Sequence, residues 1–187
     1  IRGDGEGIWK VGKEGKYTNS AQKERAAYIV SMFLEFNFVP PTVIRVLKGE
    51  EGSLQQFVPD AKTGHEVTEK DIPQGELAKL HLFDFIIDNS DREGNFYNFL
   101  VKNARIIAID HGLSFDLSRG NRYYINRDLE IPPAVRSAIL RFSEWEEGRN
   151  LLRTFLEELL SKEAVVEFFK RLGYVIRCLK KGSLFNP

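Results

Sequence analysis

The apolar residues change their spacing along the chain, and this change limits the folds open to it. Short apolar and β-branched runs in the first half are typical of strands, whereas apolar residues after position 133 recur at helical spacing. Between them, residues 59–75 are polar and contain Gly64, Pro73 and Gly75, which indicates a boundary. The sequence therefore predicts an α+β fold with two lobes. The first is a small mixed lobe over residues 1–60, with an antiparallel sheet plus a helix, and the second is a mainly helical lobe over residues 61–187.

The first lobe is predicted to contain three strands and one helix. We expect strands over residues 8–11, 42–47 and 54–58, with a hairpin-type turn over residues 49–52. Ser20 is a predicted N-cap for a helix over residues 21–35. The buried face of that helix is expected to carry Ala26, Ala27, Val30, Phe33 and Leu34.

The second lobe begins with a predicted helix over residues 76–87 and a polar loop. A β-hairpin is expected next, with strands over residues 96–101 and 106–109. Helices follow after Pro132 and Pro133, and Leu151, Leu152, Phe155 and Leu159 suggest an apolar stripe on one of them. Ser161 is the expected N-cap of the last helix, and Gly182 its end.

Composition excludes several classes of protein. The 27 basic and 27 acidic residues cancel, so we expect neither nucleic-acid binding nor a general attraction to membranes. Cys178 is the only cysteine, which rules out an internal disulfide framework and favours a reducing, cytoplasmic location. The three histidines form no zinc-type pattern, and no apolar run approaches the roughly 20 residues of a transmembrane helix.

Three polar residues occupy positions suited to magnesium and phosphate chemistry. Asp91 lies in the polar loop, Asn98 lies near the start of the next predicted strand, and Asp110 follows the return strand. Because a hairpin brings its two ends together, Asn98 and Asp110 are predicted to meet at one edge. Carboxylate and amide oxygens are ligands that magnesium accepts. Asn95 is a competitor for the role of Asn98.

Two residues of the first lobe extend this set. Lys10 ends a predicted strand and could reach a phosphate group. Glu24 lies near the start of the following helix and could hold Lys10 through an ion pair. Taken one at a time, each of these residues is more often an ordinary surface or helix-end group, so the prediction depends on their combination.

These motifs resemble the phosphatidylinositol 3- and 4-kinase-like superfamily, in particular its small bacterial members and type II phosphatidylinositol 4-kinases. The resemblance is carried by the segments at residues 89–92, 98–101 and 109–115. The segments at residues 8–10, 24–28, 39–43 and 52–58 agree with it, so it covers nearly the whole chain. It implies a protein-kinase-like fold and transfer of a phosphoryl group from ATP with Mg²⁺ or Mn²⁺.

The resemblance also implies a role for each candidate residue. Asp91 would orient or deprotonate the acceptor hydroxyl, and Lys10 would contact the phosphates, held by Glu24. Asn98 and Asp110 would be the metal ligands. Backbone groups at Gln56, Phe57 and Val58 would bind adenine.

Some alternatives stay open at the level of sequence. The family's glycine-rich phosphate loop is not evident, because Gly3, Gly5 and Gly7 lie too close to Lys10 to form it. The spacing from Asp91 to Asn98 is also longer than in most relatives. A nucleotide-binding pseudokinase is therefore the alternative to an active kinase, with nucleotidyl transfer a third reading. The acceptor could be a protein, a lipid or a small molecule, and residues 117–127 are a candidate recognition segment.

Overall fold

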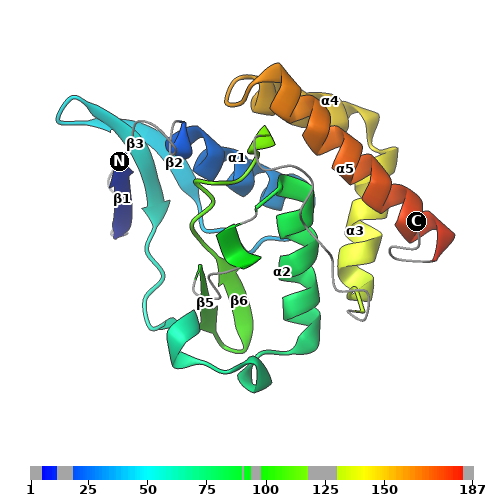
Figure 1. Ribbon diagram of the computed structural model, residues 1–187, viewed down its shortest axis with the longest axis horizontal. Helices are drawn as coiled ribbons and strands as arrows, with labels where there is room; N and C mark the ends of the chain where they lie inside the picture. The colour runs from blue at the N-terminus through cyan, green and yellow to red at the C-terminus, as the bar shows by residue number, and fades with distance from the viewer. Residues whose placement is uncertain (1–5, 12–18, 90, 94–97, 118–129, 183–187) are drawn as a thin grey trace.

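The computed structural model describes residues 6–11, 19–89, 91–93, 98–117 and 130–182. Within these ranges the protein is an α+β fold with five α-helices and two small antiparallel sheets (Figure 1). The first sheet ends at Gln56 and the second begins at Lys62. The expected α+β class is therefore confirmed, while the division into two lobes stays a prediction.

The first sheet has the strand order β1–β3–β2. Its strands are β1 (Gly7–Val11), β2 (Thr42–Leu47) and β3 (Glu50–Gln56). The hairpin turn is formed by Lys48 and Gly49, both at positive φ, so the turn predicted over residues 49–52 is wrong and Glu50 already belongs to β3. Gly52 allows β1 to lie close, because a Cβ there would collide with the Lys10 carbonyl oxygen. This register sets Lys10 opposite Ser53.

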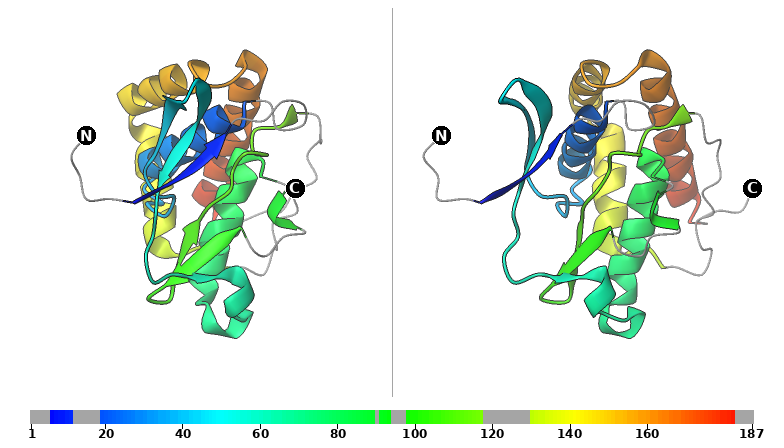
Figure 2. Two further views of the ribbon diagram at one scale, coloured as in Figure 1. Left: turned by 90° about the vertical axis from the view of Figure 1, so that its left-hand side faces the viewer. Right: turned by 60° about the vertical axis from the view of Figure 1, so that its left-hand side comes forward.

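Helix α1 (Ser20–Phe33) packs against the first sheet on one side and against α4 on the other (Figure 2). The expected apolar residues supply its inner face, with Phe33 only half-buried. The predicted N-cap is wrong. Asn19, not Ser20, occupies that position in a left-handed conformation, and its side chain makes no capping hydrogen bond.

The second sheet has the order β4–β5–β6 and lies beside helix α2 (Gln74–Ile87). Its strands are β4 (Lys62–Thr63), β5 (Phe99–Lys102) and β6 (Arg105–Ala108). Asn103 and Ala104, both at positive φ, form the tight turn of the predicted hairpin. Residues 59–75 are more ordered than a simple linker, since they contribute β4 and two short 3₁₀ helices, Gly64–Glu66 and Glu69–Asp71.

Three helices complete the chain: α3 (Pro133–Glu144), α4 (Glu146–Glu157) and α5 (Lys162–Lys181). The predicted cap of α5 is confirmed, because Ser161 Oγ accepts a hydrogen bond from the Ala164 N–H at 3.2 Å. Gly182 ends the helix at φ 72°, also as predicted. The stripe predicted on α4 is wrong at Leu151, which is exposed. Leu152 and Leu156 are the residues that face the core.

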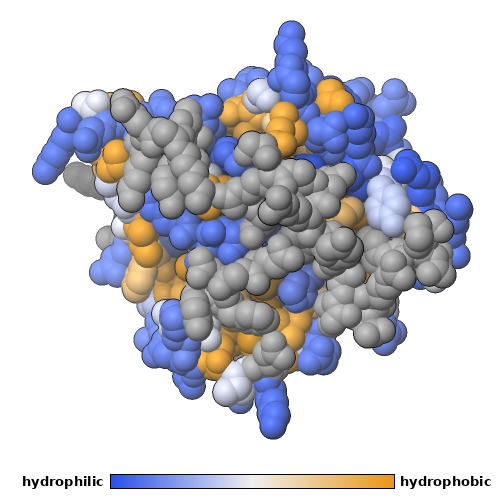
Figure 3. Space-filling model, viewed as in Figure 1, coloured by the Kyte–Doolittle hydropathy of each residue, from blue (hydrophilic) through white to orange (hydrophobic). Residues whose placement is uncertain are grey.

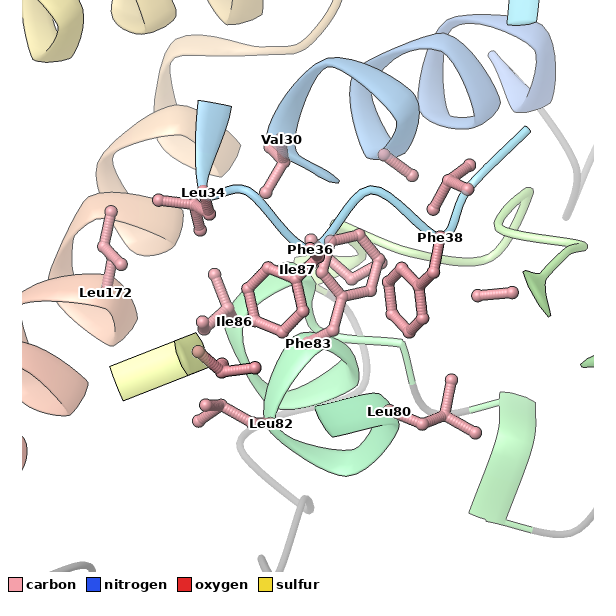
Figure 4. Close-up of a cluster of buried hydrophobic side chains, with 14 of the residues drawn as sticks. Val30, Leu34, Phe36, Phe38, Leu80, Leu82, Phe83, Ile86, Ile87 and Leu172 are labelled. Atoms are coloured by element: carbon pink, nitrogen blue, oxygen red, sulfur yellow. The ribbon is translucent and has the colours of Figure 1, made fainter. Parts of the chain in front are cut away.

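The core draws residues from all five helices and from the β5–β6 hairpin, and it is rich in aromatic rings. Phe36, Phe38 and Phe83 contact one another at centroid distances of 5.0–5.6 Å (Figure 4).

Outside the grey residues, hydrophilic side chains cover much of the face seen in Figure 3. In the part of the chain that the structure describes, no helix combines the length and the apolar character needed to cross a bilayer.

Candidate functional site

Residues from five parts of the chain line one cavity of about 550 Å³. This volume is typical of a site for a small organic molecule. Four of the predicted site residues line it, from β1, from α1, from the loop after α2 and from the end of β6. The described lining residues are Trp9, Lys10, Val11, Ser20, Glu24, Ser53, Asp91, Asp110, Gly112 and Leu113.

Lys10 lies between two carboxylates on one wall of the cavity. Its Nζ is 3.0 Å from Glu24 Oε1 and 3.3 Å from Asp110 Oδ1. Burial lowers the pKa of Lys10, but the two carboxylates outweigh burial and raise it above its usual 10.5. Lys10 is therefore positively charged at neutral pH. Its contact with a phosphate group stays a prediction.

Glu24 is the buried member of this group. Burial raises its pKa, but contact with His111 and with the Lys10 ammonium outweighs burial and lowers the pKa to about 2. Its Oε1 receives the Lys10 ammonium, whereas Oε2 has no hydrogen-bond partner among the described residues. Glu24 thus holds Lys10 in place from behind and remains ionised.

His111 lies behind the cavity wall rather than in it. Its ring is fully buried, 5.9 Å from the Phe83 ring centroid, and its Nδ1 is 3.5 Å from Glu24 Oε2. Glu24 is thus the acid that Nδ1 contacts, although neither ring nitrogen makes a hydrogen bond of normal geometry in the described structure. Burial lowers the pKa of His111, against an opposing effect of Glu24, and the ring is neutral at pH 7.

The β5–β6 hairpin brings Asn98 and Asp110 to the same end of the second sheet. Phe99 pairs with Ala108, and the Ile109 N–H donates to the Asn98 carbonyl at 3.2 Å. Asn98 Nδ2 also donates to Asp91 Oδ2 at 2.9 Å, which leaves Asn98 Oδ1 free of that bond. The prediction that the hairpin ends meet is confirmed for the backbone, and Asp91 is joined to them.

A buried ion pair beneath the cavity was not predicted from the sequence. Arg92 Nε is 2.7 Å from Asp84 Oδ2, and Nη2 is 3.1 Å from Oδ1. The Nη1 group of Arg92 donates to the carbonyls of Asn98 and Ile109. This one guanidinium therefore connects α2 to both ends of the hairpin. The signal available in the sequence was a lone acid, Asp84, inside the apolar stretch at residues 82–87.

Asn89 completes the support of the loop that carries Asp91. Its Nδ2 donates to Asp84 Oδ1 at 3.0 Å, and its Oδ1 accepts from the Asp91 N–H at 3.4 Å. Asp88, at the end of α2, contacts Arg171 Nη1 of α5 at 3.3 Å. The loop after α2 is thus held from both sides by side chains.

The predicted adenine-binding segment is not among the described lining residues. Gln56 and Phe57 lie at the end of β3 farthest from the hairpin turn, where their N–H groups donate to the carbonyls of Pro41 and Glu6 at 2.8 and 2.9 Å. In the described structure the N–H of Val58 makes no hydrogen bond. Of the three residues, Val58 is the one with a backbone donor left for a ligand.

Several predictions lie outside the described residues: Asn95, the glycines at positions 3 and 5, and most of the candidate acceptor segment at residues 117–127. No group of three His, Cys, Asp or Glu side chains with metal-binding geometry occurs within the described ranges. The pair Asn98 and Asp110 offers one amide oxygen and one carboxylate. Those ligands suit a cation that keeps most of its coordination on phosphate and water.

Comparison with known proteins adds no family assignment. No protein-family model matches the sequence, and no curated protein matches it at a significant level.

Proposed function

We propose that this protein is an ATP- and Mg²⁺-dependent phosphotransferase that acts on a hydroxyl group. The observation that carries this proposal is the meeting of Lys10, Glu24, Asp91 and Asp110 around one cavity. These residues come from four separate parts of the chain. Phosphoryl transfer needs a cation on the phosphates, oxygen ligands for a metal and a group that orients the acceptor, and the set contains all three.

Lys10 is the proposed phosphate contact, and Glu24 is its positioning residue. The ammonium is already shared between Glu24 and Asp110. An incoming phosphate would replace Asp110 as the partner of the Lys10 ammonium, because Asp110 is the more exposed of the two carboxylates. Glu24 is buried and keeps its contact. This division of roles would hold the cation in the cavity while freeing Asp110.

Asn98 and Asp110 would hold the metal, which would supply charge neutralisation on the phosphates. Asp110 has a side chain that is 52% exposed, and Asn98 Oδ1 is not used by the hydrogen bond to Asp91. Asp91 would then orient the acceptor hydroxyl through its carboxylate. The nucleotide base would contact Val58, whose backbone N–H makes no hydrogen bond in the described structure.

A nucleotide-binding protein without transfer activity is the second candidate. The observation that favours it is the hydrogen bond from Asn98 to Asp91 Oδ2, which occupies one oxygen of the proposed catalytic carboxylate. Such a protein would bind ATP with Lys10 and Asp110 but would not transfer phosphate.

The test measures ATP binding and phosphate release or transfer by the full chain with Mg²⁺. Asp110→Asn should abolish metal-dependent nucleotide binding, and Asp91→Asn should abolish transfer while ATP still binds. Asp60→Asn is the matched control, because Asp60 is exposed and, like Asp110, has a φ near 60° that asparagine tolerates.

Each outcome selects between the candidates. Loss of ATP binding in Asp110→Asn, with loss of transfer but not of binding in Asp91→Asn and neither loss in Asp60→Asn, supports the kinase proposal. Tight ATP binding without turnover in the unmodified chain supports the second candidate. ATP binding that is absent, or equal in Asp110→Asn and Asp60→Asn, would overturn both.

A further inference from the structure

A second cavity, of about 600 Å³, lies between α2, the β5–β6 hairpin and the segment that follows α1. It shares no described lining residue with the cavity that contains Lys10. Its volume is again in the range of a small-molecule site. It therefore requires an explanation separate from the proposed nucleotide site.

The charges around this second cavity are unbalanced. Lys79, Lys102 and Arg105 line it, and Glu76 is the one acid among the described lining residues. Glu76 Oε2 already accepts the Ile106 N–H at 2.9 Å. In the described structure, no carboxylate lies within ion-pair distance of Lys79, Lys102 or Arg105. Three cations thus face one carboxylate among the described lining residues, and the cavity presents net positive charge.

Lys79 lies in an environment that disfavours its positive charge. Its ammonium lies 4.7 Å from the Phe38 ring centroid, on a wall of packed aromatic side chains. Burial lowers the pKa of Lys79, Glu76 raises it, and the neighbouring Arg105 lowers it further. Aromatic contact compensates only part of the lost hydration of a half-buried ammonium. A bound anion would supply the missing counter-charge.

The donor geometry indicates what kind of anion fits. Arginine presents a planar set of N–H donors that matches the oxygens of phosphate or carboxylate groups, and lysine adds a point charge. Lys102 Nζ donates to the Pro59 carbonyl at 2.7 Å, which holds it at the rim. Of the three cations that line this cavity, Lys79 and Arg105 are the two whose side chains donate no hydrogen bond to the described part of the protein.

We propose that this cavity is a binding site for a small molecule bearing an oxyanion, either phosphate or carboxylate. Lys79 and Arg105 contact the oxyanion, and Lys102 adds charge at the rim. The site is independent of the nucleotide cavity, so it does not depend on the function proposed above. Because α2 leads directly into the loop that carries Asp91, an anion here contacts the same helix that supports the first cavity.

The test is an NMR titration of the full ¹⁵N-labelled chain with pyrophosphate and, separately, citrate, at constant ionic strength and with chloride as the reference anion. The amides of Asn103 and Ile106 report on this cavity, and Gly112 reports on the other. We expect saturable shifts at Asn103 and Ile106 that persist in Lys10→Met. Tighter binding of pyrophosphate would identify phosphate as the preferred group, and tighter binding of citrate would identify carboxylate.

Variants define the site. Lys79→Met keeps an unbranched side chain next to Phe38 but removes the charge, and Arg105→Gln keeps a polar side chain. Each should weaken binding on the order of tenfold. Lys180→Gln and Arg177→Gln remove the same charge from exposed positions of α5 and should leave binding unchanged. The same spectra show whether each variant is folded.

Three results would overturn the proposal. The first is a set of shifts that do not saturate. The second is equal affinity in the Lys79→Met/Arg105→Gln double variant and in the α5 controls. The third is loss of the Asn103 and Ile106 shifts in Lys10→Met, which would assign the anion to the first cavity instead.

Discussion

Two ion-pair groups lie within the same part of the molecule and differ in exposure. The side chains of Asp84 and Arg92 are 0% and 4% exposed, and every oxygen of Asp84 accepts a hydrogen bond. The side chains of Lys10 and Asp110 are 34% and 52% exposed and face a cavity. The buried group joins secondary structure elements, whereas the exposed group keeps polar atoms available to a ligand. Stability and ligand binding should therefore respond to different substitutions.

The largest effect should come from Asp84→Ala. It leaves the Arg92 guanidinium buried without its counter-charge, and we expect the free energy of unfolding to fall by about 3–5 kcal/mol. Chemical denaturation measures this, with Asp110→Asn as the control, where we expect a loss below about 1 kcal/mol. Similar losses in the two variants would contradict the distinction between the groups.

The second-largest effect should be the loss of stability at acidic pH that depends on Glu24. The pKa of Glu24 is about 2 in the folded protein and 4.5 as an ordinary glutamate. A lowered carboxyl pKa stabilises the fold above pH 4.5, and this stabilisation is lost as pH falls from 4.5 towards 2. It amounts to about 3 kcal/mol. Between pH 4.5 and pH 2, the free energy of unfolding should therefore fall by about 3 kcal/mol less in Glu24→Gln than in the unmodified protein. Chemical denaturation at several pH values measures this difference. Parallel curves for the two proteins would show that Glu24 is not stabilised in this way.

His111 should act at a higher pH. Its pKa is lowered in the folded state, so below about 6.5 the unfolded chain binds a proton that the folded protein does not. The free energy of unfolding should therefore decrease as pH falls from 7 to 5. We expect this slope to be shallower in His111→Gln, measured by urea denaturation. An unchanged slope would mean that His111 binds its proton equally well in the folded protein and in the unfolded chain.

The smallest effect should come from a pair at the surface. Arg141 Nη2 and Glu35 Oε2 are 2.7 Å apart, but both side chains are more than half exposed. We expect Arg141→Gln to lower the free energy of unfolding by less than about 1 kcal/mol and to lose even this difference in high salt. A larger, salt-independent loss would make the contrast between buried and exposed pairs invalid.

Local signals predicted much of the secondary structure. Helices α1, α2 and α5 and strands β1 and β2 follow from apolar spacing and from the Ser161 cap, because these depend on residues close in sequence. The turn of the first hairpin was placed too late, since Lys48 adopts a positive φ that its residue type does not suggest. Leu151 was expected to be buried, but α4 turns Leu152 and Leu156 inward, and only tertiary contacts select between adjacent faces.

The site was predictable in its members but not in its support. Lys10, Glu24 and Asp110 were singled out by type and order, and the structure brings them into contact. The Asp84–Arg92 pair was missed because eight positions separate the two residues and their contact requires the chain to reverse after α2. The second cavity draws its cations from α2 and from the hairpin, and no sequence pattern connects them.

The guanidinium of Arg92 bonds to Asp84 on α2 and to the carbonyls of Asn98 and Ile109 at the two ends of the hairpin. Opening any one of these three pieces removes part of the support of the guanidinium that holds the other two. Local unfolding here should therefore be cooperative, with the amides of the loop and of both hairpin ends exchanging with solvent at a common rate. The cavity wall would be lost and regained as a unit, so partly assembled forms of the site would be scarcely populated.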